Sequence, residues 1–228
     1  MSEIVIKDLH KIYNESQIPV YALNGINVKI NAGEFTAITG PSGSGKTTLL
    51  NLIGGLDKPS KGSVCIKGTN ISEMKSKQLV DFRLHNIGFV FQAYNLIPVL
   101  NAVENVAFIL ELQGVLKEER NAVACKFLEK VGLGDKLYQR PSHLSGGQQQ
   151  RVAVARALAS NPAFVLADEP TANLDSKSTE NLLDIMLKLN EELGITFLFS
   201  THDQRVIDRA KRILTIEDGN LIDDKTIV

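Results

Sequence analysis

The sequence predicts an α/β protein in which helices cover a mainly parallel sheet. Two short runs, FVLAD (164–168) and TFLFST (196–201), are almost wholly apolar, which is typical of strands with both faces covered. The segment between them, 176–193, has apolar residues at helical spacing and ends before Gly194. Helical periodicity also dominates residues 93–160. Strands that alternate with helices in this way favour the α/β class.

The remaining elements follow from the same two periodicities. Segments rich in β-branched residues and bounded by turns predict strands, whereas apolar residues three and four apart predict helices. Strands are expected at 3–13, 26–30, 35–40, 63–68, 87–92, 164–168 and 196–201, and helices at 46–53, 101–113, 117–131, 145–160 and 176–193. Without a long linker or repeat, the chain is expected to form one domain, 1–228. The mainly helical insert, 93–160, is then a lobe on a core made of 1–92 and 161–228.

Composition argues against several classes of function. The 228 residues carry 25 Lys and Arg against 26 Asp and Glu, so no overall basicity points to nucleic acid and no polybasic run points to anionic lipid. No segment approaches the ~20 apolar residues of a membrane helix, and the N-terminal MSEIVIKDLHKIY lacks the apolar core of a signal peptide. Cys65 and Cys125 are far apart in no metal-like spacing, and we expect reduced, mostly buried thiols of a cytosolic protein.

The stretch GPSGSGKTT (40–48) fits the form G-x-x-x-x-G-K-[ST], follows the apolar strand FTAIT and opens a helix. Its glycines let successive backbone N–H groups curl around phosphate oxygens, and the helix N-terminus adds partial positive charge. Lys46 is expected to reach the β- and γ-phosphates of a nucleotide, and the Thr47 hydroxyl to bind Mg²⁺. The nucleotide-binding residues expected here are Gly40, Pro41, Ser42, Gly43, Ser44, Gly45, Lys46, Thr47 and Thr48. The alternative is a Gly/Ser turn that matches by coincidence, and the strand before it and the helix after it argue against that.

Two adjacent carboxylates follow the buried strand in FVLADEP (164–170). Asp168, at the strand end, is expected to hold Mg²⁺ through water, as in other P-loop proteins. Glu169 next to it can polarise an attacking water as a general base. The alternative, a solvated acidic turn, fits poorly with a position after an apolar strand downstream of a P-loop.

Two further polar side chains are expected at the same edge of the sheet. FLFSTHD (197–203) delivers His202 at a strand terminus, where it can bind the γ-phosphate and hold water and Glu169 in register. Gln92 ends another strand in FVFQ. Ligands of open α/β sheets collect at the carboxyl ends of the strands. The other histidines, His10, His85 and His143, have no such setting and are expected to be surface or packing residues.

Taken in order, these motifs resemble those of the nucleotide-binding subunit of ABC transporters, over nearly the whole chain. The marks are an aromatic residue near the N-terminus (Tyr13), the P-loop, Gln92, LSGGQ (144–148), the LADE pair, NLD (173–175) and His202. The resemblance implies a P-loop NTPase core with a mainly parallel sheet, an N-terminal antiparallel β part and a helical subdomain. It also implies that Gln92 is a third Mg²⁺ ligand and that Tyr13 stacks on the adenine of ATP. Packing of a strand-end aromatic is the alternative for Tyr13.

LSGGQ indicates a second phosphate-binding helix start. Ser145 is a good N-cap candidate, and Gly146 and Gly147 leave backbone N–H groups open to an anion. The resemblance implies that Ser145, Gly146, Gly147 and Gln148 bind the γ-phosphate of ATP held by a second copy of the chain. Two chains then form a head-to-tail dimer around two nucleotides, with Asp175 along the shared seam. ATP bridges the halves and hydrolysis removes the bridge, a γ-phosphate switch.

Longer stretches resemble a narrower branch, the ATPases of lipoprotein-release and macrolide-export systems, with the cell-division relative close by. The matching text includes ALNGINVKINAGEFTAITGPSGSGKTTLLNLIGGLDKPSKG and LSGGQQQRVAVARALASNPAFVLADEPTANLDS. The branch implies a cytoplasmic subunit on the inner face of the cell membrane, docked on an integral-membrane permease. Because macrolide exporters often carry the permease on the same polypeptide and this sequence stops at Val228, a separate permease subunit is expected.

The apolar stretch AYNLIPVLNAVENV, after Gln92, is a candidate floor for a coupling helix of the permease. Tyr94 and Leu96 are expected to be its exposed contacts. Packing within the lobe is the alternative, and it accounts for most of Val103, Val106 and Ile109.

Three other functions compete with transport. An ATP-gated clamp or a cell-division-type signalling subunit would turn over little ATP, against which Glu169 and His202 argue. A soluble relative acting on ribosomes or DNA would usually carry two ATPase units or a long coiled coil, and this sequence has neither. A P-loop kinase would leave LSGGQ unexplained.

Overall fold

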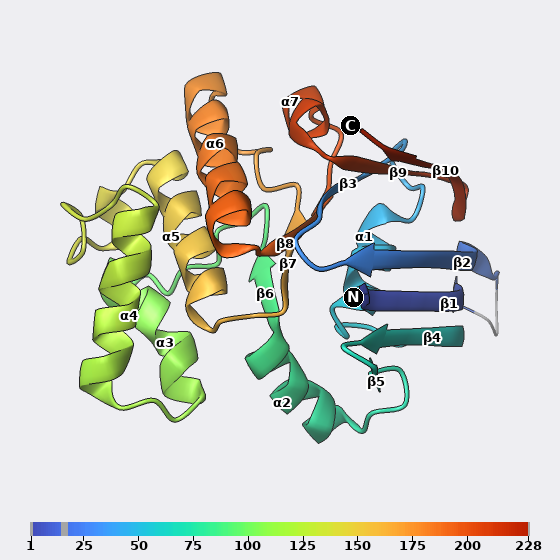
Figure 1. Ribbon diagram of the computed structural model, residues 1–228, viewed down its shortest axis with the longest axis horizontal. Helices are drawn as coiled ribbons and strands as arrows, with labels where there is room; N and C mark the ends of the chain where they lie inside the picture. Colours follow the sequence, from blue (N-terminus) through green and yellow to red (C-terminus); the bar gives the residue numbers. More distant parts are fainter. Residues whose placement is uncertain (1, 15–17, 228) are drawn as a thin grey trace.

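The computed structural model describes residues 2–14 and 18–227 and is built around a six-stranded sheet (Figure 1). The strand order is β10-β9-β3-β8-β7-β6, and all neighbours are parallel except β10, which is antiparallel to β9. Its strands are β3 (Phe35–Thr39), β6 (Ile87–Val90), β7 (Phe164–Asp168), β8 (Thr196–Ser200), β9 (Arg212–Glu217) and β10 (Asn220–Thr226). The predicted α/β class with a mainly parallel sheet is confirmed.

A second, antiparallel sheet of four strands lies beside the first (Figure 1). Its order is β2-β1-β4-β5, with β1 (Ser2–Tyr13), β2 (Val20–Asn31), β4 (Lys61–Ile66) and β5 (Thr69–Asn70). Alternate residues of β2 are buried in its second half, as expected for a sheet with one solvent face. Helix α1 (Lys46–Ile53) buries Leu49, Leu50, Leu52 and Ile53 in the core that joins both sheets. The predicted N-terminal antiparallel part is confirmed.

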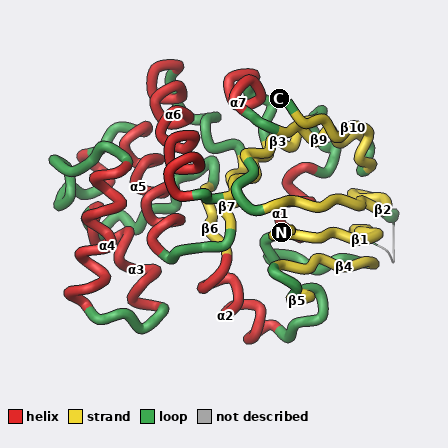
Figure 2. The backbone as a smooth tube through the Cα atoms, viewed as in Figure 1, coloured by secondary structure: helices red, strands yellow, loops and turns green. Residues whose placement is uncertain are grey.

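A group of helices lies on the side of the parallel sheet away from the antiparallel sheet (Figure 2). They are α3 (Ala102–Leu112), α4 (Lys117–Lys130), α5 (Gly146–Ala159) and α6 (Ser176–Leu193), with a short 3₁₀ turn at Pro141–His143. Helix α5 is the centre of this half, because most of its side chains are buried, Val152, Val154 and Leu158 among them. Within residues 2–14 and 18–227, no helix combines the length and apolarity needed to cross a membrane.

Several expectations from the sequence need correction. Helix α2 (Ser76–Asn86) was not expected, and its only buried side chain is Leu79, so it carries no apolar stripe. Helix α7 (Gln204–Arg209) and strands β9 and β10 were likewise not assigned. Strand β6 ends at Val90, so Gln92 lies beyond the strand rather than at its last position. The two cysteines are half-buried rather than mostly buried.

Candidate functional site

The P-loop joins the end of β3 to the start of α1, at the carboxyl edge of the parallel sheet. Gly40 has φ 142° and Gly45 has φ 107°, conformations that L-side chains rarely adopt. A Cβ atom at Gly40 would lie 1.9 Å from the Ile216 carbonyl oxygen, and one at Gly45 would lie 2.5 Å from the Ala22 carbonyl oxygen. Only glycine therefore lets the loop pass this close to its neighbours and curl before the helix.

Two polar side chains of the loop have hydrogen-bonding capacity left for a ligand. The Lys46 ammonium donates to the carbonyl oxygens of Gly40 (2.9 Å) and Pro41 (2.8 Å), which leaves one of its three N–H hydrogens. The Ser44 hydroxyl is buried and has no hydrogen-bond partner in the described part of the chain. A buried hydroxyl without a partner is costly, so a phosphate oxygen at this loop would satisfy it.

A cavity of about 320 Å³ opens beside the loop. It is walled by the start of β2, the P-loop and the ends of β7 and β8. Its lining comprises Val20, Tyr21, Ala22, Ser42, Gly43, Gly45, Lys46, Thr47, Thr48, Glu169 and Ser200. Apolar atoms on one wall and backbone N–H groups with a cation on the other suit a nucleotide, whose base and phosphates differ in the same way.

Thr47 and Asp168 meet across this edge. The Thr47 hydroxyl donates to Oδ1 of Asp168 at 3.2 Å, which joins the start of α1 to the end of β7. A hydroxyl and a carboxylate supply the hard oxygen ligands that Mg²⁺ prefers, so the residues present fit this ion. Gln92 is exposed, and its carbonyl oxygen accepts a bond from Asn173 Nδ2 at 3.0 Å. Within the described part of the chain, no hydrogen bond joins the Gln92 side chain to Thr47 or Asp168.

Glu169 and His202 form a hydrogen-bonded pair of side chains at this edge. Nδ1 of His202 lies 2.7 Å from Oε1 of Glu169. The His202 side chain is 76% exposed, whereas that of Glu169 is 19% exposed. The other carboxylate oxygen, Oε2 of Glu169, is buried without a partner among the described residues. Glu169 also has φ 46°, the left-handed region, which aims its side chain toward the cavity at a cost in backbone strain.

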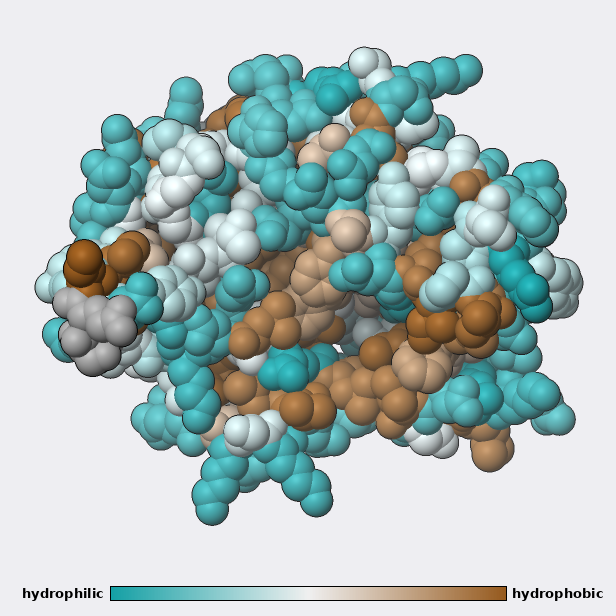
Figure 3. Space-filling model, turned by 180° about the vertical axis from the view of Figure 1, so that it is seen from behind, coloured by the Kyte–Doolittle hydropathy of each residue, from teal (hydrophilic) through white to brown (hydrophobic). Residues whose placement is uncertain are grey.

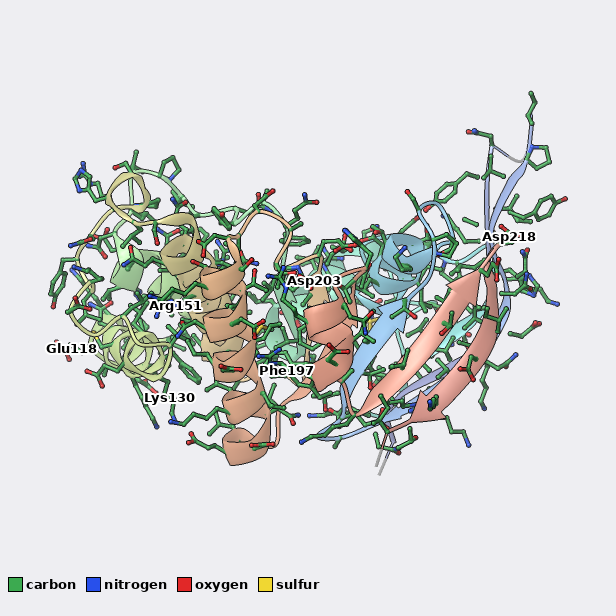
Figure 4. All side chains as sticks on the ribbon, turned by 90° about the horizontal axis from the view of Figure 1, so that it is seen from above. Glu118, Lys130, Arg151, Phe197, Asp203 and Asp218 are labelled. Carbon is green, nitrogen blue, oxygen red and sulfur yellow. The ribbon has the colours of Figure 1, made fainter. Side chains whose placement is uncertain are left out.

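A second layer of bonds, which the sequence analysis missed, joins the segments that follow Glu169 and His202. The Thr171 hydroxyl donates to Oδ2 of Asp203 at 2.9 Å, and Arg205 donates to both oxygens of the same carboxylate. The bonds from Arg205 lower the pKa of Asp203 to about 2. Figure 4 shows Asp203 near the middle of the molecule, between the helical half and the sheets. In the sequence, the one indication of these bonds is a charged residue, Asp203, directly after His202.

The LSGGQ residues lie elsewhere, at the start of α5. Ser145 is the N-cap, and its hydroxyl oxygen accepts from the Gln148 backbone N–H at 3.3 Å while the Gln148 side chain accepts from the Ser145 N–H at 2.8 Å. A separate cavity of about 270 Å³ includes Ser145, Gly147 and Gln148 and shares no lining residue with the P-loop cavity. Within one chain, the structure does not bring LSGGQ into the P-loop cavity.

Helix α6 packs closely against this start. A Cβ atom at Gly147 would lie 2.8 Å from the Ser178 side chain, and one at Gly146 would lie 2.7 Å from the Tyr94 hydroxyl oxygen. Asp175 caps α6 by accepting from the N–H and the hydroxyl of Ser178, which lowers its pKa. The glycines are therefore needed for close packing inside the chain as well as for an open helix start.

Gln150 is a further residue that sequence reasoning did not single out. It is fully buried on α5, and its side-chain NH₂ group donates to the carbonyl oxygens of Phe91 (3.2 Å) and Pro170 (2.8 Å). It thereby joins the LSGGQ helix to the segments that carry Gln92 and Glu169. A polar residue among the apolar positions of α5 was the available signal.

The expected exposure of Tyr94 and Leu96 is wrong. Both are half-buried, because Leu96 packs against the helical core and the Tyr94 hydroxyl donates to the Asn173 carbonyl oxygen at 3.4 Å. The large exposed apolar residue of this stretch is Val99, with 70% of its surface accessible.

Tyr13 ends β1 and pairs with Val20 of β2, which lines the P-loop cavity. Tyr13 is 37% exposed, and its hydroxyl donates to Oδ2 of Asp57 at 2.9 Å. The remaining histidines are away from the cavity lining: His10 contacts Asp8, His85 contacts the Asp81 carbonyl oxygen, and His143 is exposed in the 3₁₀ turn.

Known proteins resemble this chain over most of its length. A family model described as ABC transporter matches residues 23–172. An uncharacterized ABC transporter ATP-binding protein of Thermotoga maritima is 49% identical over 214 residues, which covers 94% of this chain and 91% of that protein. The macrolide export ATP-binding/permease protein MacB of Mannheimia succiniciproducens is 47% identical over 224 residues, 98% of this chain and 35% of MacB. The chain thus spans about a third of that relative.

Among solved structures, a similar one is the ATP-binding cassette MJ0796, described as dimeric, in a post-hydrolysis state and bound to ADP and Pi. It matches with a TM-score of 0.89 at 43% identity and covers 99% of both chains. MJ0796 of Methanocaldococcus jannaschii is 46% identical to this chain over 222 residues, 96% of this chain and 94% of MJ0796.

Proposed function

The chain belongs to the ABC transporter family, and we propose that it dimerises head to tail around ATP to drive a membrane permease. It is an ATPase of the ABC type that uses ATP and Mg²⁺. The observation that carries the mechanism is the Glu169–His202 pair, 2.7 Å apart, beside the P-loop cavity.

The residues at the cavity take the following parts. The P-loop N–H groups, Ser44 and Lys46 bind the β- and γ-phosphates. Thr47, Gln92 and Asp168, the last through water, would hold Mg²⁺, which would supply positive charge against the phosphates. Tyr13 stacks on the adenine.

Hydrolysis needs a base beside the γ-phosphate. Glu169 accepts a proton from the attacking water, whose oxygen bonds to the γ-phosphorus as the bridging P–O bond to ADP breaks. His202 orients that carboxylate and contacts the γ-phosphate. The pair therefore produces ADP and phosphate from ATP and water.

We propose a second copy of the chain because of the position of LSGGQ. Ser145, Gly146, Gly147 and Gln148 present a helix start that shares no lining with the P-loop cavity of their own chain. The proposed ligand is the γ-phosphate held by a partner subunit, with Asp175 along the seam. The description of MJ0796 as a dimer supports this arrangement.

The proposed permease belongs to the lipoprotein-release or macrolide-export type and sits in the membrane, with this chain on its cytoplasmic face. MacB relatives 46–47% identical to the chain support the branch. In Figure 3 brown apolar surface spreads across the lower middle of the face seen from behind. Exposed Leu56, Val80 and Val99 are the contacts proposed in place of Tyr94 and Leu96.

Phosphate release from Mg²⁺-ATP tests the proposal. The purified chain should release phosphate well above a Glu169→Gln control, and the rate per chain should rise with protein concentration because two chains complete each site. Release no greater than that of the control would favour the second candidate, a cell-division-type ATP-gated subunit with low turnover. A rate per chain independent of dilution would overturn the shared site.

A further inference from the structure

We propose that Lys11 and Asp57 are positioning residues that hold the ring of Tyr13 ready to stack on adenine. The inference rests on the base-stacking part of the proposed function and goes beyond it, because it assigns the residues that orient the ring. The Lys11 ammonium lies 4.7 Å from the centroid of the Tyr13 ring, within the range of a cation–π contact. The Tyr13 hydroxyl donates to Oδ2 of Asp57 at 2.9 Å. The ring is therefore held by its face and by its edge.

The Lys11 ammonium is itself held in place by neighbouring residues. The Lys11 side chain is only 12% exposed, and its ammonium donates to Oδ1 of Asp57 and to the Lys58 carbonyl oxygen, each at 2.8 Å. The Lys58 backbone N–H donates to the same Asp57 oxygen at 2.7 Å. Burial raises the pKa of Asp57, but the bonds from Lys11, Lys58 and Tyr13 together outweigh it and lower the pKa below its ordinary value. Lys11 and Asp57 thus form one closed set of bonds around Tyr13.

The same set ties the base site to the phosphate site. The Asp57 backbone N–H bonds to the Asn51 carbonyl oxygen of α1, the helix whose first residues are Lys46 and Thr47. On its other side Tyr13 pairs with Val20, which lines the P-loop cavity. The ring is consequently fixed relative to both the phosphate loop and the apolar wall of the cavity.

Holding the Tyr13 ring in place reduces the entropy that is lost when ATP binds. Base–aromatic stacking depends on the orientation of the ring, and ordering a free side chain at the moment of binding weakens affinity. A ring already held by Lys11 and Asp57 avoids that loss. A cation beneath the ring also stays in a site from which most water is excluded, where cation–π contacts are stronger.

Calorimetric titration of ATP into the full chain tests the inference. Lys11→Met keeps the apolar stem and removes the cation, and Asp57→Ala removes the acceptor of the Tyr13 hydroxyl. Each should raise the Kd for ATP about fivefold. Lys11→Arg should restore affinity to within about twofold, because it keeps a cation. Lys7→Met is the matched control on the same strand, since Lys7 is exposed, and it should leave the Kd unchanged.

A double-mutant cycle separates a positioning role from a purely structural one. In a Tyr13→Ala background, Lys11→Met should cause no further loss, because no ring remains to be held. The inference is overturned if Lys11→Met leaves the Kd unchanged or if its effect is the same with and without the ring. If Tyr13→Ala alone leaves the Kd unchanged while Lys46→Ala raises it, the base-stacking part of the proposed function fails and this inference fails with it. Thermal unfolding without nucleotide, compared with Lys11→Arg, shows whether a variant is folded.

Discussion

Nδ1 of His202 lies 2.7 Å from Oε1 of Glu169, while Oε2 of Glu169 is buried and has no partner within residues 2–14 and 18–227. His202 therefore orients one carboxylate oxygen, and the other is left without a hydrogen-bond partner. Because His202 is 76% exposed, it can meet a phosphate on its solvent side without releasing the carboxylate. This geometry fits the general base proposed for hydrolysis.

Replacing Glu169 by glutamine should trap an ATP-bound dimer. The amide keeps the size of the side chain but cannot accept a proton, so turnover should fall by about 100-fold or more. In the presence of Mg²⁺ and ATP the variant should elute from a sizing column at twice the mass of the chain. Glu118→Gln is the control, because Glu118 is exposed on α4. A Glu169→Gln variant that stays monomeric with ATP would contradict the bridging role of the nucleotide.

Ser145→Arg should block both dimerisation and turnover while sparing ATP binding. The substitution puts a long cation at the N-cap of α5, outside the cavity that holds the P-loop. The Kd for ATP, measured by calorimetry, should change by less than about twofold, whereas phosphate release should fall to the level of Glu169→Gln. Ser142→Arg, three residues earlier at an exposed position, should retain turnover. Full turnover of Ser145→Arg would exclude the shared site.

Asp203 should stabilise the fold in a pH-dependent way. Its pKa is lowered from 3.8 to about 2, so its ion pair and hydrogen bonds are fully present above pH ~4 and are lost as the pH falls toward 2. Asp203→Asn should lower the free energy of unfolding by about 1–2 kcal/mol at pH 7, after allowance for solvent screening. In urea titrations the difference from the natural chain should shrink as the pH falls from about 4 to 2. A difference that does not change with pH would rule out the charge as its cause.

The sequence predicts the parts of the molecule that depend on local periodicity. Strands β7 and β8 and helix α6 were located because their side chains are apolar in runs or at helical spacing, and the P-loop because its residue types follow one form. Helix α2 is not predicted by this periodicity, because Leu79 is its one buried side chain and no apolar stripe marks the helix. The apolar stretch after Gln92 predicts a docking floor with Tyr94 and Leu96 exposed, but both are half-buried against Asn173 and the helical core, partners that are distant in sequence.

Contacts between distant loops are the other part that the sequence does not disclose. Thr171 and Asp203 are 32 residues apart, and Gln150 is 59 residues from Phe91. The sequence around each of these four residues does not indicate which distant residue it will contact. These bonds depend on how strands β7, β8 and helix α5 come together in three dimensions.

Gln150→Met tests how far the LSGGQ helix and the catalytic edge act as one unit. Methionine fills a similar volume but donates no hydrogen bond, so the carbonyl oxygens of Phe91 and Pro170 lose their contacts with α5. The free energy of unfolding should fall by about 1–3 kcal/mol. Turnover at saturating ATP should also fall, because Pro170 directly follows Glu169, while the Kd for ATP should stay within about twofold. Gln149→Met is the matched control, since Gln149 is only half-buried and bonds to the Leu144 carbonyl oxygen of its own helix start. Loss of stability with unchanged turnover would show that Gln150 holds the two halves together without influencing the position of Glu169.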